Sequence, residues 1–268
     1  MGDRVPSIMM LPLAMAISGW FLAVPLLLGF GLLLVAGIVK SSFKINTKPT
    51  FIELPDDTPL PEPLRAAIEA WDPELQRLGY TRKNLLACDD MQPNSSMVLL
   101  FYLSQSEPSA AMIASIEARA KHAAGEHIIA NTFVEFSGDL VDGTCVTAGN
   151  AKEVGFGPRG PDRVMLVLPK ADVKTVHAIY CKAIAMRGPL KPLEPGLTIN
   201  QYAERSVMRF VNRCVKHGYL QAPGEHGVAR ITWKGAIIGT VTNIPPMLQL
   251  WRWLGLREAR ALAAQVAP

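Results

Sequence analysis

The sequence has few of the side chains that usually carry catalysis or bind metals. Its 268 residues include only 4 cysteines and 5 histidines. The cysteines Cys88, Cys145, Cys181 and Cys214 stand apart, with no C-x-x-C spacing. That pattern excludes a zinc ribbon and a dense disulfide framework. We therefore expect four reduced thiols with a structural role.

Catalytic and cofactor signatures are also missing. His122 and His127 are five positions apart, a spacing that shares neither a helix face nor a strand face, so solvated loop positions suit them better than metal ligation. Cys145 has no flanking nucleophile pattern, and the GFGPRG segment at 155–160 lacks the strand–turn–helix context of a dinucleotide-binding turn. We predict no catalytic residue, no cofactor and no metal.

The strongest feature that is present is an uncharged run from Met9 to Val39. About 20 apolar residues suffice to span a bilayer, whereas the apolar part of a cleaved signal peptide is usually about 7–15 residues long. The run therefore predicts one uncleaved transmembrane anchor over residues 9–40, with Trp20 at a headgroup boundary. A lipobox-like Leu85-Leu86-Ala87-Cys88 lies too far downstream to be a processing site.

Charges around this run predict its orientation. Arg4 stands alone before it, while Lys40, Lys44 and Lys48 follow it. Lysine and arginine near a span are retained on the cytoplasmic side. We expect a single-pass protein of the cell inner membrane with its C-terminal part in the cytoplasm. The Pro- and Asp-rich residues 41–62 read as an extended tether that lifts this part from the bilayer.

The remaining chain predicts an α+β fold with a mainly antiparallel sheet, flanking helices and a C-terminal helix–hairpin–helix. Expected domains are an N-terminal tail (1–8), an α+β domain (63–188), a basic helix and hairpin subdomain (189–243) and an amphipathic C-terminal helix (244–268). Helices are expected at Pro63–Leu78 and Ala171–Arg187. Strands are expected at Thr81–Cys88, Met97–Leu103, His127–Phe136, Thr144–Ala148 and Val164–Leu168, and Ser106–Ala124 fits a strand slightly better than a helix. The pair Asp142-Gly143 indicates a tight hairpin turn and Ser137-Gly138 a bulge.

A basic helix is predicted from Ile199 to His217. Its cations Arg205, Arg209, Arg213 and Lys216 lie opposite an apolar face. Two short strands around Pro223-Gly224, with Trp233 in the second, would follow. Helix and hairpin together resemble the recognition helix and wing of winged-helix proteins over about 40 residues. Such a helix could neutralise phosphates. A solvated outer face explains these four cations better than phosphate binding does. Contact with anionic lipid or with an acidic protein surface is the second interpretation, and nucleic acid is an unlikely partner.

The C-terminal segment predicts an amphipathic helix from Pro246 to Gln265. Trp251, Arg252 and Trp253 lie at one end of it and Arg257 and Arg260 further along. Indoles and guanidinium groups suit the membrane interface. A partner subunit or the protein's own core are the other surfaces on which the helix could pack.

The segments FVEFSGDLVDGT and TWKGA carry a resemblance to uncharacterised bacterial single-span membrane-anchored proteins. The resemblance implies an anchor and a soluble domain but no known activity. We expect a non-catalytic accessory or scaffold subunit of a membrane protein complex, bound to the lipid bilayer. A membrane-tethered winged-helix-like regulator that binds nucleic acid and an enzyme of unrecognised type are the alternatives.

Overall fold

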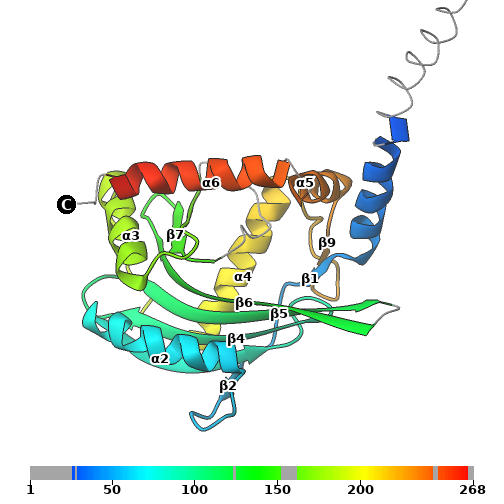
Figure 1. Cartoon of the computed structure of the whole chain (residues 1–268). Helices are drawn as coiled ribbons and strands as arrows, with labels where there is room; N and C mark the ends of the chain where they lie inside the picture. Colours follow the sequence, from blue (N-terminus) through cyan, green and yellow to red (C-terminus); the bar gives the residue numbers. More distant parts are fainter. Residues whose placement is uncertain (1–25, 28, 123–124, 152–161, 244–246, 265–268) are drawn as a thin grey trace, which may run out of the picture.

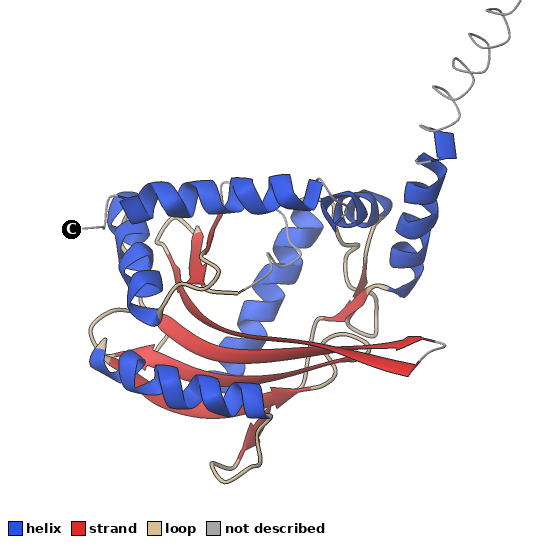
Figure 2. Ribbon diagram, in the orientation of Figure 1, coloured by secondary structure: helices blue, strands red, loops and turns tan. Residues whose placement is uncertain are grey.

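The computed structural model describes residues 26–27, 29–122, 125–151, 162–243 and 247–264. It is an α+β protein in which helices cover both faces of a seven-stranded sheet (Figures 1 and 2). The elements are β1 (Lys44–Asn46), β2 (Ile52–Leu54), α2 (Glu62–Arg77), β3 (Tyr80–Cys88), β4 (Ser95–Ser104), β5 (Ala110–His122), β6 (Gly125–Asp139), β7 (Cys145–Gly149), β8 (Arg163–Val167), α3 (Val173–Arg187), α4 (Ile199–Lys216), β9 (Val228–Arg230), α5 (Trp233–Asn243) and α6 (Met247–Ala264).

The large sheet has the order β2-β3-β4-β5-β6-β7-β8. Neighbouring strands are antiparallel except β7 and β8, which run parallel. The predicted α+β class with a mainly antiparallel sheet is confirmed. The ambiguous stretch before residue 124 is strand β5, because its alternating side chains pair with both β4 and β6.

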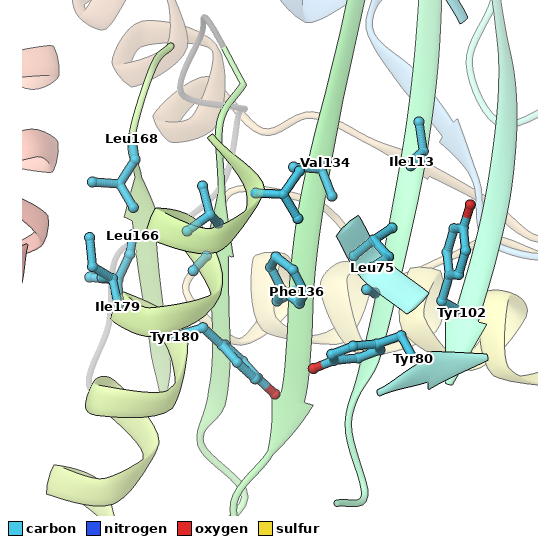
Figure 3. Packing of buried hydrophobic residues seen from close by; sticks show 14 of the residues in the cluster. Leu75, Tyr80, Tyr102, Ile113, Val134, Phe136, Leu166, Leu168, Ile179 and Tyr180 are labelled. Carbon is cyan, nitrogen blue, oxygen red and sulfur yellow. The ribbon is translucent and has the colours of Figure 1, made fainter. Parts of the chain in front are cut away.

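The main hydrophobic core lies between one face of the sheet and helices α2 and α3. Leu75 of α2, Phe136 of β6 and Ile179 of α3 are fully buried there (Figure 3). Helix α2 begins beside Pro63, where a missing N–H costs nothing, and Gly79 follows it with φ 83°. Both helices confirm the predicted positions.

Helix α4 crosses the opposite face of the sheet. Thr198 and Gln201 form a reciprocal capping box at its start. Ile199 and Ala203 in its first turns pack against Phe133 and neighbouring sheet residues. Its later turns, through Val211 and Cys214, join a third cluster with β1, β9, α5 and the N-terminal helix. The predicted basic helix is confirmed.

Residues 29–42 are helical and leave the domain beside α5 (Figure 1). In the described parts of the chain, no helix is both long enough and apolar enough to cross a membrane. Most of the anchor predicted for residues 9–40, including Trp20, lies outside the described residues. The anchor therefore stays a prediction.

The predicted tether over residues 41–62 is wrong. β1 pairs with β9 through Lys44 and Arg230, and β2 pairs with β3. Thr47 and Phe51 between the two strands are buried. Because each strand pairs with a segment far away in the chain, the composition of residues 41–62 gave no sign of this pairing.

The predicted C-terminal hairpin is also corrected. Leu220 and Ile231 form a single bridge, but β9 pairs with β1 rather than with a second hairpin strand. Trp233 begins helix α5 instead of ending a strand. Thr232 starts this helix, since its hydroxyl accepts from the backbone N–H of Gly235 at 3.0 Å. The resemblance to a winged-helix recognition helix and wing is therefore lost.

The β6–β7 hairpin is confirmed, with two differences in detail. Only Gly143 of the turn has a positive φ, 86°, while the Asp142 carboxylate accepts from the N–H of Thr144 at 2.8 Å. The bulge predicted at Ser137-Gly138 is wrong, because the register with β7 is regular through both residues. Gly138 has a packing role instead.

Candidate functional site

The candidate site is the polar surface between α4 and the ends of β6, β7 and β8. A cavity of about 50 Å³ opens there between Asp139 at the end of β6, the loop before α4, and α4 itself. Its walls include Lys191, Glu194, Tyr202, Arg205 and Arg209. The volume admits a few water molecules and is well below the several hundred Å³ of a typical small-molecule pocket.

Arg205 and Arg209, the first two cations of α4, are paired with acids at this cavity. The guanidinium of Arg209 lies 2.9 Å from the carboxylate of Asp139 and also stacks over the ring of Tyr202. Arg205 pairs with Glu194, whose pKa this hydrogen bond holds below its usual range. Burial raises the pKa of Tyr202, although a hydrogen bond with Ser137 acts against the rise. The phenol is therefore neutral at physiological pH.

The last two cations meet Asp162, just before β8. Lys216 lies 3.4 Å from its carboxylate, and Arg213 donates to its backbone carbonyl at 3.4 Å. His217 approaches the same carboxylate at 3.5 Å. Partial burial opposes ionisation of Asp162, but the contacts with Lys216 and His217 outweigh it and lower its pKa. All four predicted basic residues thus contact partners within the protein.

Cys145 and Glu135 lie deeper on this side of the sheet. Burial is the main cause that raises the pKa of the Cys145 thiol, and Asp139 adds to it, while Arg213 and Arg163 act in the opposite direction. Burial also raises the pKa of Glu135, which Arg163 offsets in part. A thiol with a raised pKa is a poor nucleophile at neutral pH. The geometry therefore favours a structural role for Cys145 over a catalytic one.

A second polar group lies on the other face of the sheet. The sulfur of Cys181 is 3.4 Å from Nε2 of His177, one turn away on α3. Burial lowers the pKa of His177 and raises that of Cys181, so the two stay neutral rather than forming a thiolate–imidazolium pair. The i, i+4 spacing of the two residues was a usable sequence signal that we missed.

Metal binding finds no support among the described residues, since no three acidic, histidine or cysteine side chains gather closely enough to hold an ion. The loop positions expected for His122 and His127 are wrong, because the two residues belong to the paired strands β5 and β6. Their side chains lie outside the described ones. All four cysteines are free, as expected.

The predicted interface residues are only partly placed. Trp253, Arg257 and Arg260 are exposed on α6. Trp251 and Arg252 belong to the same helix, but their side chains lie outside the described ones. The sequence pattern did not reveal the acids Asp139, Asp162 and Glu194 as partners of the α4 cations, because those contacts are tertiary.

No family model, curated protein or solved structure matches this chain. The fold and the site define an α+β protein with a basic helix in which Arg205, Arg209 and Lys216 are paired with acids of the same chain. The resemblance to single-span bacterial proteins stays a prediction.

Proposed function

We propose that this chain is a non-catalytic accessory or scaffold subunit of a membrane protein complex, anchored by one N-terminal span. The observation that carries the proposal is the exposed apolar surface of helix 29–42, together with that of Leu26 and Leu27, which precede it in the chain. Leu26, Leu27, Phe30, Leu33 and Leu34 are each more than half exposed, from 72% at Leu26 to 52% at Leu34.

This exposure is unfavourable in water. Burying one leucine or phenylalanine side chain is worth about 1.5–3 kcal/mol, and these residues remain uncovered by the described chain. A helix that is apolar on most of its circumference is typical of a buried or membrane-spanning segment. The uncharged sequence continues towards Met9, so a bilayer is the surrounding that this helix fits best.

Lysines at the end of the helix support a cytoplasmic domain. Lys40, Lys44 and Lys48 lie where the chain enters the domain, and lysines at this position are retained in the cytoplasm. The cell inner membrane is the location we propose.

A binding role also fits the polar surface around α4. Three of the four α4 cations are paired with the protein's own acids, the Cys145 thiol is protonated at neutral pH, and the cavity is small. These features favour structure and partner contact over chemistry.

A projecting arm offers a contact surface for the partner subunit. The β5–β6 ribbon continues beyond the last β4 pairing at Ala118 and extends away from the sheet (Figure 2). Ile128 and Ile129 are neighbours on β6, and both are more than half exposed. Since neighbouring strand residues point to opposite faces, the ribbon presents isoleucine on both. A partner subunit that packed on the ribbon would remove this apolar surface from water, which is favourable.

Carbonate extraction tests the anchor. We expect the full-length chain to stay in the membrane pellet and the double variant Leu27→Asp/Phe30→Asp to leave it, because a charge near the bilayer centre costs about 3 kcal/mol. The control is Ile52→Asp/Val141→Asp, which places the same charges at exposed apolar positions on the domain. If the wild-type chain is extracted, or if both variants behave alike, the anchor is refuted.

Purification in mild detergent tests the scaffold role. We expect a membrane protein to co-purify in fixed stoichiometry and to be lost from Ile128→Glu/Ile129→Glu but kept by the Ile52→Asp/Val141→Asp control. A chain that purifies alone, with its fold intact, would speak against an accessory subunit.

A further inference from the structure

Helices α5 and α6 are in contact at one level of the molecule, with α5 at the end where α6 begins, and together they form the α5–α6 layer (Figure 1). Helix 29–42 rises beside α5 and away from the domain (Figure 1). The contact between α5 and helix 29–42 is close. Trp233 of α5 packs at Gly37, where an added Cβ would lie 3.8 Å from the indole. Residues 29–35 extend beyond this point by about 10 Å at 1.5 Å per residue. Whatever surrounds the exposed part of this helix therefore also borders the α5–α6 layer.

The connection between this helix and the domain is short. The helix ends at residue 42, and β1 begins at Lys44 and pairs with Arg230. Phe43 also contributes to the join, because its backbone N–H donates to Val39 and its carbonyl accepts from Ile231. Without a tether, the domain is held directly at the end of the helix.

Helix α6 has one face in the core and one outside. Ala259 and Leu262 are buried against α3 and β8. At about 100° per residue, Trp253 lies on the side opposite Leu262, and it is half exposed together with Leu250. Arg257 and Arg260 continue the exposed side. This outer side of α6 points away from the core, as helix 29–42 does (Figure 1).

The chemistry of this outer side matches a lipid headgroup region. The guanidinium of Arg257 stacks over the indole of Trp253 at 5.7 Å. The sequence of α6 contains three arginines and one acid, Glu258. Tryptophan favours the depth of the headgroups, and arginine near an anionic surface contributes about 1 kcal/mol.

We propose that the outer side of α6 lies flat on an anionic bilayer surface, with Trp253 and Leu250 at headgroup depth and Arg257 and Arg260 on lipid phosphates. The inference rests on the proposed anchor. It adds a fixed orientation, in which the α5–α6 layer faces the membrane and the sheet faces away from it.

Quenching of tryptophan emission by lipids with brominated chains tests this orientation. The full-length chain is reconstituted into nanodiscs of zwitterionic lipid, or of the same lipid mixed with phosphatidylglycerol. The signal of Trp253 is the difference between wild type and Trp253→Phe. We expect this signal to be quenched in the anionic discs, to be quenched less in the zwitterionic discs, and to recover as salt is added, because salt screens the phosphate contacts.

Charge reversal supplies the matched comparison. Arg257→Glu/Arg260→Glu should lose most of the Trp253 quenching in anionic discs, by about tenfold or more in the docked-to-free ratio. Arg65→Glu/Arg77→Glu makes the same change on α2, which lies at the opposite end of the molecule from α6 (Figure 1), and should change nothing. The salt series on the wild-type chain gives an answer even if a variant misfolds.

Three outcomes overturn the inference. Trp253 emission that is unquenched in both lipids places α6 away from the bilayer. Quenching that is the same in both lipids and at all salt concentrations would show that Arg257 and Arg260 do not bind lipid phosphates. Protection of Trp253 only when a co-purified subunit is present assigns the surface to that subunit. In each case the chain has entered the discs and the anchor stands, whereas a chain that does not enter them overturns both proposals.

Discussion

The hydroxyl of Tyr180 on α3 lies against the backbone of Gly138 on β6, where it takes the place of a side chain. A Cβ added at Gly138 would lie 2.5 Å from this oxygen and 2.7 Å from Leu190 Cδ2. The Tyr180 ring stacks with Phe136, two residues away on the same face of β6. Gly138 thus lets α3 approach the sheet, and it closes the core next to the cavity at Asp139.

Replacing this glycine tests the contact. We expect Gly138→Ala to lower the free energy of unfolding by about 1–3 kcal/mol, the usual cost of overpacking. Thermal or urea unfolding of the full-length chain in mild detergent measures the change. Gly224→Ala is the control, because a Cβ there meets nothing within 4 Å. Equal stabilities of the two variants would show that α3 moves aside without cost.

Much of the sheet was predictable, because each long strand carries its own alternation of buried and exposed residues. Met97, Leu99 and Phe101 of β4 face α4, while Leu100 and Tyr102 face α2 and α3. Such a pattern is local and visible in the sequence. The β6–β7 hairpin itself was predictable from the turn at Gly143, but its regular register was not, because a bulge was predicted at Ser137-Gly138.

The errors share a different cause. β1 has only three residues, and its pairing with β9 joins Lys44 to Arg230. Helix α5 was hidden because Ile231 and Trp233 alternate as in a strand, although Thr232 supplied a helix N-cap. The acids that meet the α4 cations lie in other elements. Local pattern predicts a helix face, but it does not reveal which residue lies opposite that face in the fold.

The neutralised basic face of α4 predicts weak binding to nucleic acid. A phosphate would have to displace Asp139, Asp162 or Glu194 from its cation. We expect the wild-type chain not to change the fluorescence anisotropy of a labelled DNA duplex at low salt. Asp139→Asn/Asp162→Asn/Glu194→Gln should create binding that weakens steeply with salt, because the freed cations can then release counterions from DNA.

Matched variants separate this effect from net charge. Asp56→Asn/Asp57→Asn/Glu53→Gln changes the charge equally, at exposed positions away from α4, and should bind DNA no better than wild type. Tight, salt-dependent binding by the wild-type chain, abolished by Arg205→Glu/Arg209→Glu/Arg213→Glu, would instead restore the nucleic-acid alternative.

Asp172 at the start of α3 predicts a pH dependence of stability. Its carboxylate accepts from the N–H of Thr175 at 2.7 Å, and this bond lowers the pKa of the carboxyl. A lowered pKa means that the ionised cap stabilises the fold above about pH 4, the unfolded value, and that this contribution is lost as the pH falls through the folded value. Asp172→Ala should therefore cost about 1 kcal/mol at pH 7 and progressively less below pH 4. Chemical unfolding at several pH values measures the difference, and a cost that does not vary with pH would rule out the charge as its source.

A new cysteine tests which side of the membrane the domain occupies. Ser106 is exposed in the turn between β4 and β5, so Ser106→Cys provides an accessible thiol. A membrane-impermeant maleimide should miss it in intact cells and label it after permeabilisation. The unsubstituted chain should give little background at Cys88 and Cys214, because burial raises the pKa of each to about 11. Labelling from outside would reverse the proposed orientation.

The buried and exposed sides of α6 predict different losses of stability when a leucine on each side is replaced by alanine. Leu262 is buried against α3 and β8, whereas Leu250 is nearly half exposed. We expect Leu262→Ala to lower the free energy of unfolding by about 2–4 kcal/mol, because it leaves a cavity in the core. Leu250→Ala should change it by less than about 0.5 kcal/mol, as is usual for a surface substitution. Unfolding of the full-length chain in detergent, followed by near-UV circular dichroism, compares the two on the same helix. If both truncations are silent, α6 does not pack on the core, and the bilayer-facing orientation of its outer side loses its structural basis. If both are costly, Leu250 is covered by something that detergent does not replace, and the outer side belongs to a protein contact.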